Sequence, residues 1–70
     1  MRYDDFRDCI RDELRRHHAG FTWAQLKRRL KLPYERPCPS WVARMETEIG
    51  LTRSPAGGRA YVWTMKRRSV

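Results

Sequence analysis

The sequence predicts an α+β domain, a three-helix bundle followed by a C-terminal β-hairpin. Up to residue 50, apolar side chains recur every three or four positions, which is the spacing of one helix face. From Leu51 onward the period falls to two, in β-branched and aromatic stretches separated by a turn rich in Pro and Gly. Seventy residues suit one domain, with an ordered core expected from about residue 4 to 65 and a basic tail at 66–70.

The first helix is expected from about Asp4 to His18. Asp4 or Asp5 is expected to cap its start, because a carboxylate can accept from the unpaired N–H groups there. Residues about one turn apart form its apolar stripe: Tyr3, Phe6, Ile10, Leu14 and His17. Opposite charges three residues apart give a nearly neutral outer face: Asp4–Arg7, Asp8–Arg11 and Asp12–Arg15. Gly20 is expected to end the helix in a left-handed conformation.

Phe21 is expected to form a short extended link before the second helix. Thr22 opens that helix, because Thr22 and Gln25 have the spacing of a capping box. Its buried stripe consists of three large residues: Trp23, Leu26 and Leu30. Pro33 disfavours helical geometry at Leu32, so the chain is expected to form a loop over residues 33–37.

The third helix is expected to begin near Pro39, since proline fits the first helical position. Its inner stripe comprises Val42, Met45 and Ile49, with Trp41 on the flank. The opposite side, by helical rotation, presents Ser40, Ala43, Arg44 and Thr47. Gly50 is expected to end this helix in a Schellman turn.

The hairpin is expected to have strands at residues 51–53 and 59–65, joined by a turn at residues 54–58. Side chains alternate between the two faces of a strand. Tyr61, Trp63 and Met65 therefore share one face, which we expect to pack on the core.

The charge distribution indicates a surface for polyanions. Basic residues outnumber acidic ones by 16 to 8. Residues 21–38 hold five basic side chains and one acidic, and residues 52–70 hold five basic and no acidic side chains. Such blocks suit a nucleic-acid-binding face, the alternative being a general solubility charge.

Several other functions are not expected from this sequence. The spacing of Cys9, Cys38, His17 and His18 matches no common zinc motif, so no metal or other cofactor is expected and both thiols should be reduced. A chain this short offers little cleft for catalysis, so we expect no enzyme. No apolar run could span a bilayer and no signal region follows Met1, so a cytoplasmic protein without membrane contact is expected.

The order of helix, link, helix, loop, helix and hairpin resembles the winged helix-turn-helix superfamily over about residues 4–65. Three short segments carry the resemblance: Phe21-Thr22-Trp23, Ile49-Gly50-Leu51, and Gly57-Gly58-Arg59 before Ala60-Tyr61-Val62-Trp63. The resemblance implies binding of double-stranded DNA, with the third helix in the major groove and the hairpin along the backbone or minor groove. It implies a small transcriptional regulator or accessory DNA-binding protein. The contacts carried over by position are Ser40, Arg44 and Thr47 near bases, Arg53, Gly57, Gly58 and Arg59 in the wing, and Lys27, Arg28, Tyr34 and Arg36 on the backbone.

The third helix leaves alternatives open, because it carries Glu46 and Glu48 beside a single basic residue. Either these glutamates face the second helix or the hairpin, or the wing is the main contact. A protein-docking module using Trp41, Glu46 and Glu48 is one alternative, and a binder of structured RNA is another. A homodimer formed through the first helix is also open.

The tryptophans could stack on bases, but Trp23 and Trp63 are expected in the core because both lie on inner stripes. Trp41 and Tyr34 could instead be exposed at a partner surface.

Overall fold

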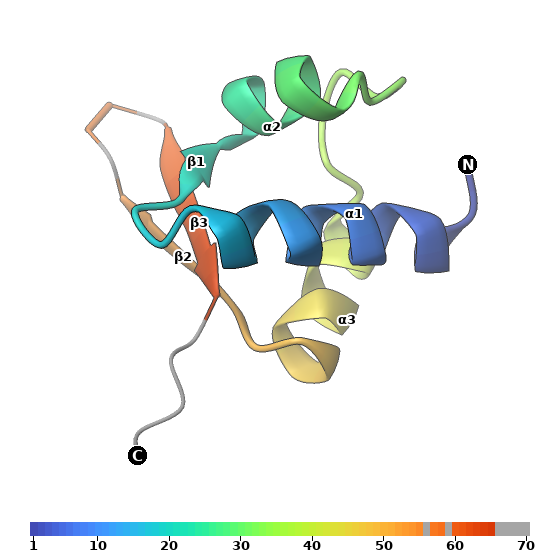
Figure 1. Cartoon of the computed structure of the whole chain (residues 1–70). Coiled ribbons are helices and arrows are strands. Elements are labelled where there is room, and N and C mark those ends of the chain that lie inside the picture. Colours follow the sequence, from blue (N-terminus) through green and yellow to red (C-terminus); the bar gives the residue numbers. More distant parts are fainter. Residues whose placement is uncertain (56, 59, 66–70) are drawn as a thin grey trace.

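The computed structural model describes residues 1–55, 57–58 and 60–65. Within these residues it contains three helices and a three-stranded antiparallel sheet, which confirms the α+β class. The elements in chain order are α1 (Tyr3–Arg16), β1 (Phe21–Thr22), α2 (Trp23–Leu30), α3 (Pro39–Glu48), β2 (Leu51–Pro55) and β3 (Tyr61–Met65). Figure 1 shows α1 crossing the molecule, with α2 above it, α3 below it and the sheet beside its C-terminal end.

The start of α1 differs from the expected one. Arg2 is the N-cap residue and its side chain makes no capping bond, so the assignment of Asp4 or Asp5 as the cap was wrong. The reason is that Phe6 N already donates to Arg2 O at 3.0 Å, which places both aspartates inside the first turn. There their charges favour the helix through its dipole.

The end of α1 also comes earlier than expected, at Arg16. Gly20 is left-handed, with φ +82°, but it lies beyond the C-cap residue His17. Gly20 N donates to His17 O at 2.9 Å, so the glycine closes the turn after the helix.

His17 is exposed, so its expected place on the core stripe was wrong. Because the helix ends at Arg16, His17 leaves the helical path. Its ring packs edge-on against Phe21, with 4.9 Å between the ring centroids. The buried polar group on α1 is Glu13, whose Oε1 lies 3.1 Å from Arg29 Nη2 and 3.3 Å from His17 Nε2.

Two of the three expected ion pairs on α1 are present, Asp4–Arg7 at 3.7 Å and Asp8–Arg11 at 3.4 Å. The third was wrong, since Asp12 pairs with Arg11 at 3.2 Å. Arg11 directly precedes Asp12, and its guanidinium reaches both Asp12 and Asp8.

The capping box of α2 is confirmed. Thr22 Oγ1 accepts from Gln25 N at 3.3 Å, and Gln25 Oε1 accepts from Thr22 N at 2.9 Å. The start of α3 at Pro39 is confirmed as well, and Gly50 follows that helix with φ +70°. Local hydrogen-bonding and proline rules therefore located these boundaries correctly.

The hairpin strands have different bounds from those expected. β2 continues to Pro55, which pairs with Tyr61, and β3 begins at Tyr61. Proline is tolerated at the end of a strand on the edge of a sheet, where no ladder N–H is needed. The expected link at Phe21 is a third strand, because Phe21 pairs with Trp63 and Thr22 with Val62.

The core lies between α1, the inner faces of α2 and α3, and β3. Its buried residues are Tyr3, Phe6, Ile10, Leu14, Leu26, Leu32, Val42, Met45, Leu51 and Trp63. Trp63 is 2% exposed, as expected, whereas the prediction for Tyr61 was wrong because Tyr61 is 47% exposed. Tyr61 lies at the turn end of β3, where the space beside it is an open cleft.

Candidate nucleic-acid interface

An open cleft of about 330 Å³ separates the start of α2 from the hairpin. Its lining comes from β1, α2, the loop before α3, and the hairpin: Thr22, Trp23, Ala24, Pro37, Arg53, Ala60, Tyr61 and Trp63. The strand order β1-β3-β2 brings these segments together, since β3 pairs with Thr22 on one side and Arg53 on the other. None of the lining residues belongs to α1.

Flat side chains form much of the cleft wall. The rings of Trp23 and Trp63 lie 5.5 Å apart between centroids, at an interplanar angle of 30°. Trp23 Nε1 donates to Glu35 O at 2.9 Å, which fixes that ring. The Arg53 guanidinium carbon lies 5.6 Å from the Tyr61 ring centroid and 5.8 Å from that of Trp63. The cleft therefore combines aromatic surface with a cation.

Acidic side chains neutralise some of the predicted DNA contacts. Lys27 Nζ lies 2.9 Å from Glu35 Oε1, and its hydrogen bond holds the pKa of Glu35 below the ordinary value. Arg53 Nη2 lies 3.6 Å from Glu46 Oε1. Both pairs are partly exposed, and exposed pairs contribute little, so a phosphate can compete for these cations.

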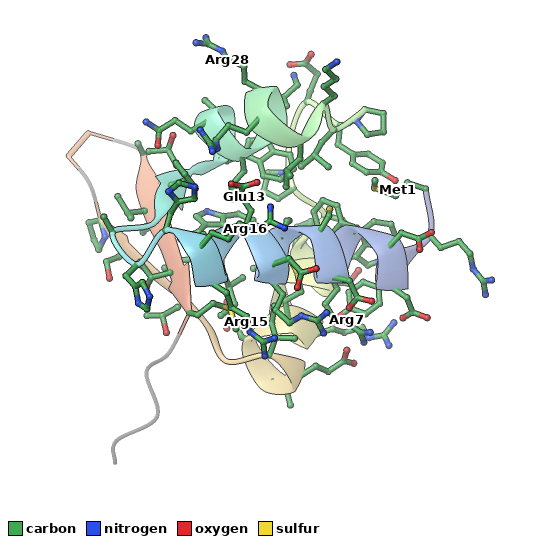
Figure 2. All side chains as sticks on the ribbon, viewed as in Figure 1. Met1, Arg7, Glu13, Arg15, Arg16 and Arg28 are labelled. Carbon is green, nitrogen blue, oxygen red and sulfur yellow. The ribbon has the colours of Figure 1, made fainter. Side chains whose placement is uncertain are left out.

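Other cations have no acidic partner among the described residues. They are Arg2, Arg15, Arg16, Arg28, Lys31 and Arg36. Arg28 follows the cleft residue Ala24 by one helical turn, so both lie on the same side of α2. In Figure 2, Arg28 extends away from α2, on the side opposite α1. Arg36 directly precedes the cleft residue Pro37.

The exposed face of α3 is small and polar. Ser40, Ala43 and Thr47 are exposed on it, as expected, and the hydroxyl of Thr47 donates to Ala43 O at 3.4 Å. Such short side chains allow close approach of another molecule to the helix.

Arg44 extends from α3 toward α1. Its guanidinium carbon lies 4.0 Å from the Tyr3 ring centroid, and its Nη2 lies 3.2 Å from Glu48 Oε2. Glu48 Oε1 also accepts from Arg7 Nη1 and from the Tyr3 hydroxyl, both at 2.9 Å. The Arg7 hydrogen bond, followed by that of Tyr3, holds the pKa of Glu48 below its usual value.

The two α3 glutamates therefore face other elements. Glu46 faces the hairpin through Arg53, as one sequence interpretation allowed, whereas Glu48 faces α1, which was not foreseen. Their negative charges are paired, so they oppose a phosphate backbone less than the sequence suggests.

Tyr34 and Trp41 belong to an aromatic cluster around Phe6. Their rings lie 5.7 Å and 5.1 Å from the Phe6 ring between centroids. The Tyr34 hydroxyl donates to Met1 O at 3.2 Å. Both side chains are half-buried, so they offer less to a partner than an exposed ring would.

The hairpin turn is described only in part. Gly57 and Gly58 are exposed, with φ +101° and +58°, conformations that favour glycine. Arg59 and the expected basic tail over residues 66–70 lie outside the described residues.

Sequence analysis did not identify the cleft. Thr22, Ala24, Pro37 and Tyr61 carried signals for a cap, a helix, a loop and a core strand, and only the tertiary structure places them together. The alternation along β3 was the one usable signal, because it places Tyr61 on the face of Trp63.

The described residues contain no group of three His, Cys, Asp or Glu side chains placed to hold a metal ion. Cys9 and Cys38 are free thiols, and burial raises the pKa of Cys9. A hydrogen bond with Ser40 lowers the pKa of Cys38. Within the same residues, each helix is too short or too polar to cross a membrane.

No protein-family model matches the chain, and it matches neither a curated protein nor a solved structure. Its function is therefore inferred from the placement of the cleft, the α3 face and the unpaired cations.

Proposed function

We propose that the chain is a winged helix-turn-helix domain that binds double-stranded DNA, as a small transcriptional regulator or accessory DNA-binding protein. One observation carries the proposal: the hairpin, the start of α2 and the loop before α3 meet at one cleft. Two arginines without an acidic partner among the described residues adjoin cleft residues in the chain: Arg28 follows Ala24 by one helical turn, and Arg36 directly precedes Pro37. In the proposed complex, a phosphate backbone lying along the cleft contacts these two arginines and Arg53.

The fold is compatible with this proposal. A three-stranded sheet with a C-terminal hairpin follows the element order of a winged helix, and α3 is preceded by a loop and a second helix. In the proposed complex Thr47 and Ser40 approach base edges, while Arg44 contacts phosphate from the α1 side. The cationic hairpin and α2 supply most of the affinity, since phosphate contacts dominate DNA binding.

Matched charge reversals test the interface. Arg28→Glu and Arg36→Glu alter residues that adjoin cleft residues, whereas Arg2→Glu changes net charge equally at the N-terminal end of α1, away from the sheet (Figure 1). The molecule measures 36 × 29 × 22 Å, while charges are screened beyond about 8 Å at physiological salt. Distant and adjacent reversals should therefore have different effects.

The assay is fluorescence anisotropy with a mixed-sequence duplex, titrated between low and moderate salt. We expect each cleft-side reversal to weaken binding and to lower the magnitude of the log–log salt slope by about 0.9 for each phosphate that the variant no longer neutralises. Arg2→Glu should leave the slope near that of the wild type. Equal effects from all three variants, or no binding at low salt, would overturn the proposal.

The protein-docking alternative is less well supported. It relies on Trp41, Glu46 and Glu48, yet Trp41 packs on Phe6 and both glutamates are paired within the molecule. Competition between DNA and RNA duplexes distinguishes the proposed DNA binding from binding of structured RNA. The narrow major groove of A-form RNA does not admit a helix such as α3, so DNA should compete better.

A further inference from the structure

We propose that the cleft between α2 and the hairpin binds one unstacked base of a DNA strand. The domain would then bind a duplex with an unpaired nucleotide more tightly than an uninterrupted duplex. This inference rests on the proposed DNA binding and adds a preference for DNA structure.

The size and lining of the cleft suit a single flat ring system. Its volume of about 330 Å³ is at the small end of the range for small-molecule sites, roughly 300–1,000 Å³. Trp23, Trp63 and Tyr61 supply aromatic surface, and Pro37 and Ala24 supply small apolar groups. Aromatic side chains bind unpaired bases by stacking, which tolerates any base because each has a π face.

Tyr61 is the residue best placed to stack. Among the described residues, only Tyr61 and the N-terminal Met1 are large hydrophobic side chains that stay exposed. The partly buried Trp23 and the buried Trp63 form a fixed wall, so Tyr61 can pack on an inserted ring without unfolding the core. The exposed ring of Tyr61 would bury additional surface when a ligand enters the cleft, and this burial would favour binding.

Polar groups at the cleft can read the edge of a base. Thr22 Oγ1 accepts from Gln25 N, which leaves its hydroxyl hydrogen able to donate. Arg53 has only the 3.6 Å contact with Glu46 as an ion pair among the described residues, so its N–H groups can turn toward a base or the adjoining phosphate.

Charge distinguishes a nucleotide from an uncharged ligand. Among the described residues, the cleft lining includes Arg53 and no acidic side chain. Arg28 follows Ala24 by four residues and Arg36 directly precedes Pro37, so two cations without an acidic partner among the described residues adjoin the lining, while Lys27 is paired with Glu35. A base brings its own phosphates to these cations, which makes nucleic acid the occupant that complements the cleft.

The test compares two DNA duplexes that differ by one extrahelical 2-aminopurine, with the full chain and two variants. Tyr61→Leu keeps apolar bulk but removes the ring, whereas Tyr61→Phe keeps the ring. We expect the wild type and Tyr61→Phe to prefer the bulged duplex by roughly 5- to 140-fold, the range typical of a single base stacked on an aromatic side chain. Tyr61→Leu should lose most of that preference, measured as the ratio of its affinities for the two duplexes.

The fluorescence of 2-aminopurine provides an independent readout, because stacking on an aromatic ring quenches it. Quenching with the wild type and Tyr61→Phe but not with Tyr61→Leu supports the inference. Equal, salt-dependent binding of both duplexes with unchanged fluorescence overturns it and leaves the proposed DNA binding intact. Failure to bind either duplex overturns both.

Discussion

Substitution of Gly20 by alanine tests the close approach of the α1–β1 turn to the sheet. Gly20 has φ +82°, and a Cβ added there would meet the Trp63 carbonyl oxygen. The same Cβ would lie 2.5 Å from Thr64 Cγ2 and 2.9 Å from Val62 Cγ1. The carbonyl cannot move without disturbing β3, which pairs with β1 and β2 on both sides.

Two effects add in this variant. A left-handed conformation costs a non-glycine residue about 1–3 kcal/mol. Overpacking against β3 adds about 1–3 kcal/mol. The expected loss of about 2–6 kcal/mol is large, since a domain of this length is stable by roughly 3.5–10 kcal/mol. A loss of about 3 kcal/mol lowers the midpoint of thermal unfolding by roughly 12–24 °C.

Gly58→Ala is the matched control, because Gly58 also has positive φ, at +58°, but no atom of the described residues lies within 4 Å of an added Cβ. Gly58→Ala should lower the free energy of unfolding only by the cost of the left-handed conformation, about 1–3 kcal/mol. Urea denaturation followed by tryptophan fluorescence measures both variants. If Gly20→Ala and Gly58→Ala lower the free energy of unfolding by the same amount, the close approach to β3 is refuted.

Three further predictions concern a helix cap, an ion pair and the α3 face. Thr22→Ala removes the capping bond to Gln25 and should lower the free energy of unfolding by about 1 kcal/mol, measured by denaturation. Because the pKa of Glu48 is depressed, mainly by Arg7, its stabilisation is present above the ordinary glutamate pKa of about 4.3 and is lost as pH falls through the lower folded value. Glu48→Gln should therefore flatten the fall in thermal midpoint on acidification, and an unchanged profile would contradict this. Thr47→Ala should alter base preference in a binding-site selection while leaving the salt slope unchanged, because Thr47 is exposed on α3 and carries no charge.

The order of the elements and several of their boundaries could be predicted from the sequence. The start of α2 is set by hydrogen bonds between Thr22 and Gln25, and the start of α3 is set by the backbone dihedral angle of Pro39. Both effects involve only residues within one helical turn. Because such interactions need no distant partner, the helix boundaries that they set can be predicted from the neighbouring residues. The buried positions of Phe6 and Leu26 followed in the same way from helical period.

Tertiary structure decided which charges are neutralised and where the cleft lies. Glu48 is paired with Tyr3 and Arg7, which lie more than 40 positions away, and Arg53 could have faced solvent as readily as Glu46. An ionic side chain has many possible partners in a sequence with this much charge, and the packing of elements selects among them. Tyr61 stays exposed because the helices leave space beside the turn end of β3. The alternation of side chains along a strand predicts which face a residue is on, but not whether another element covers that position.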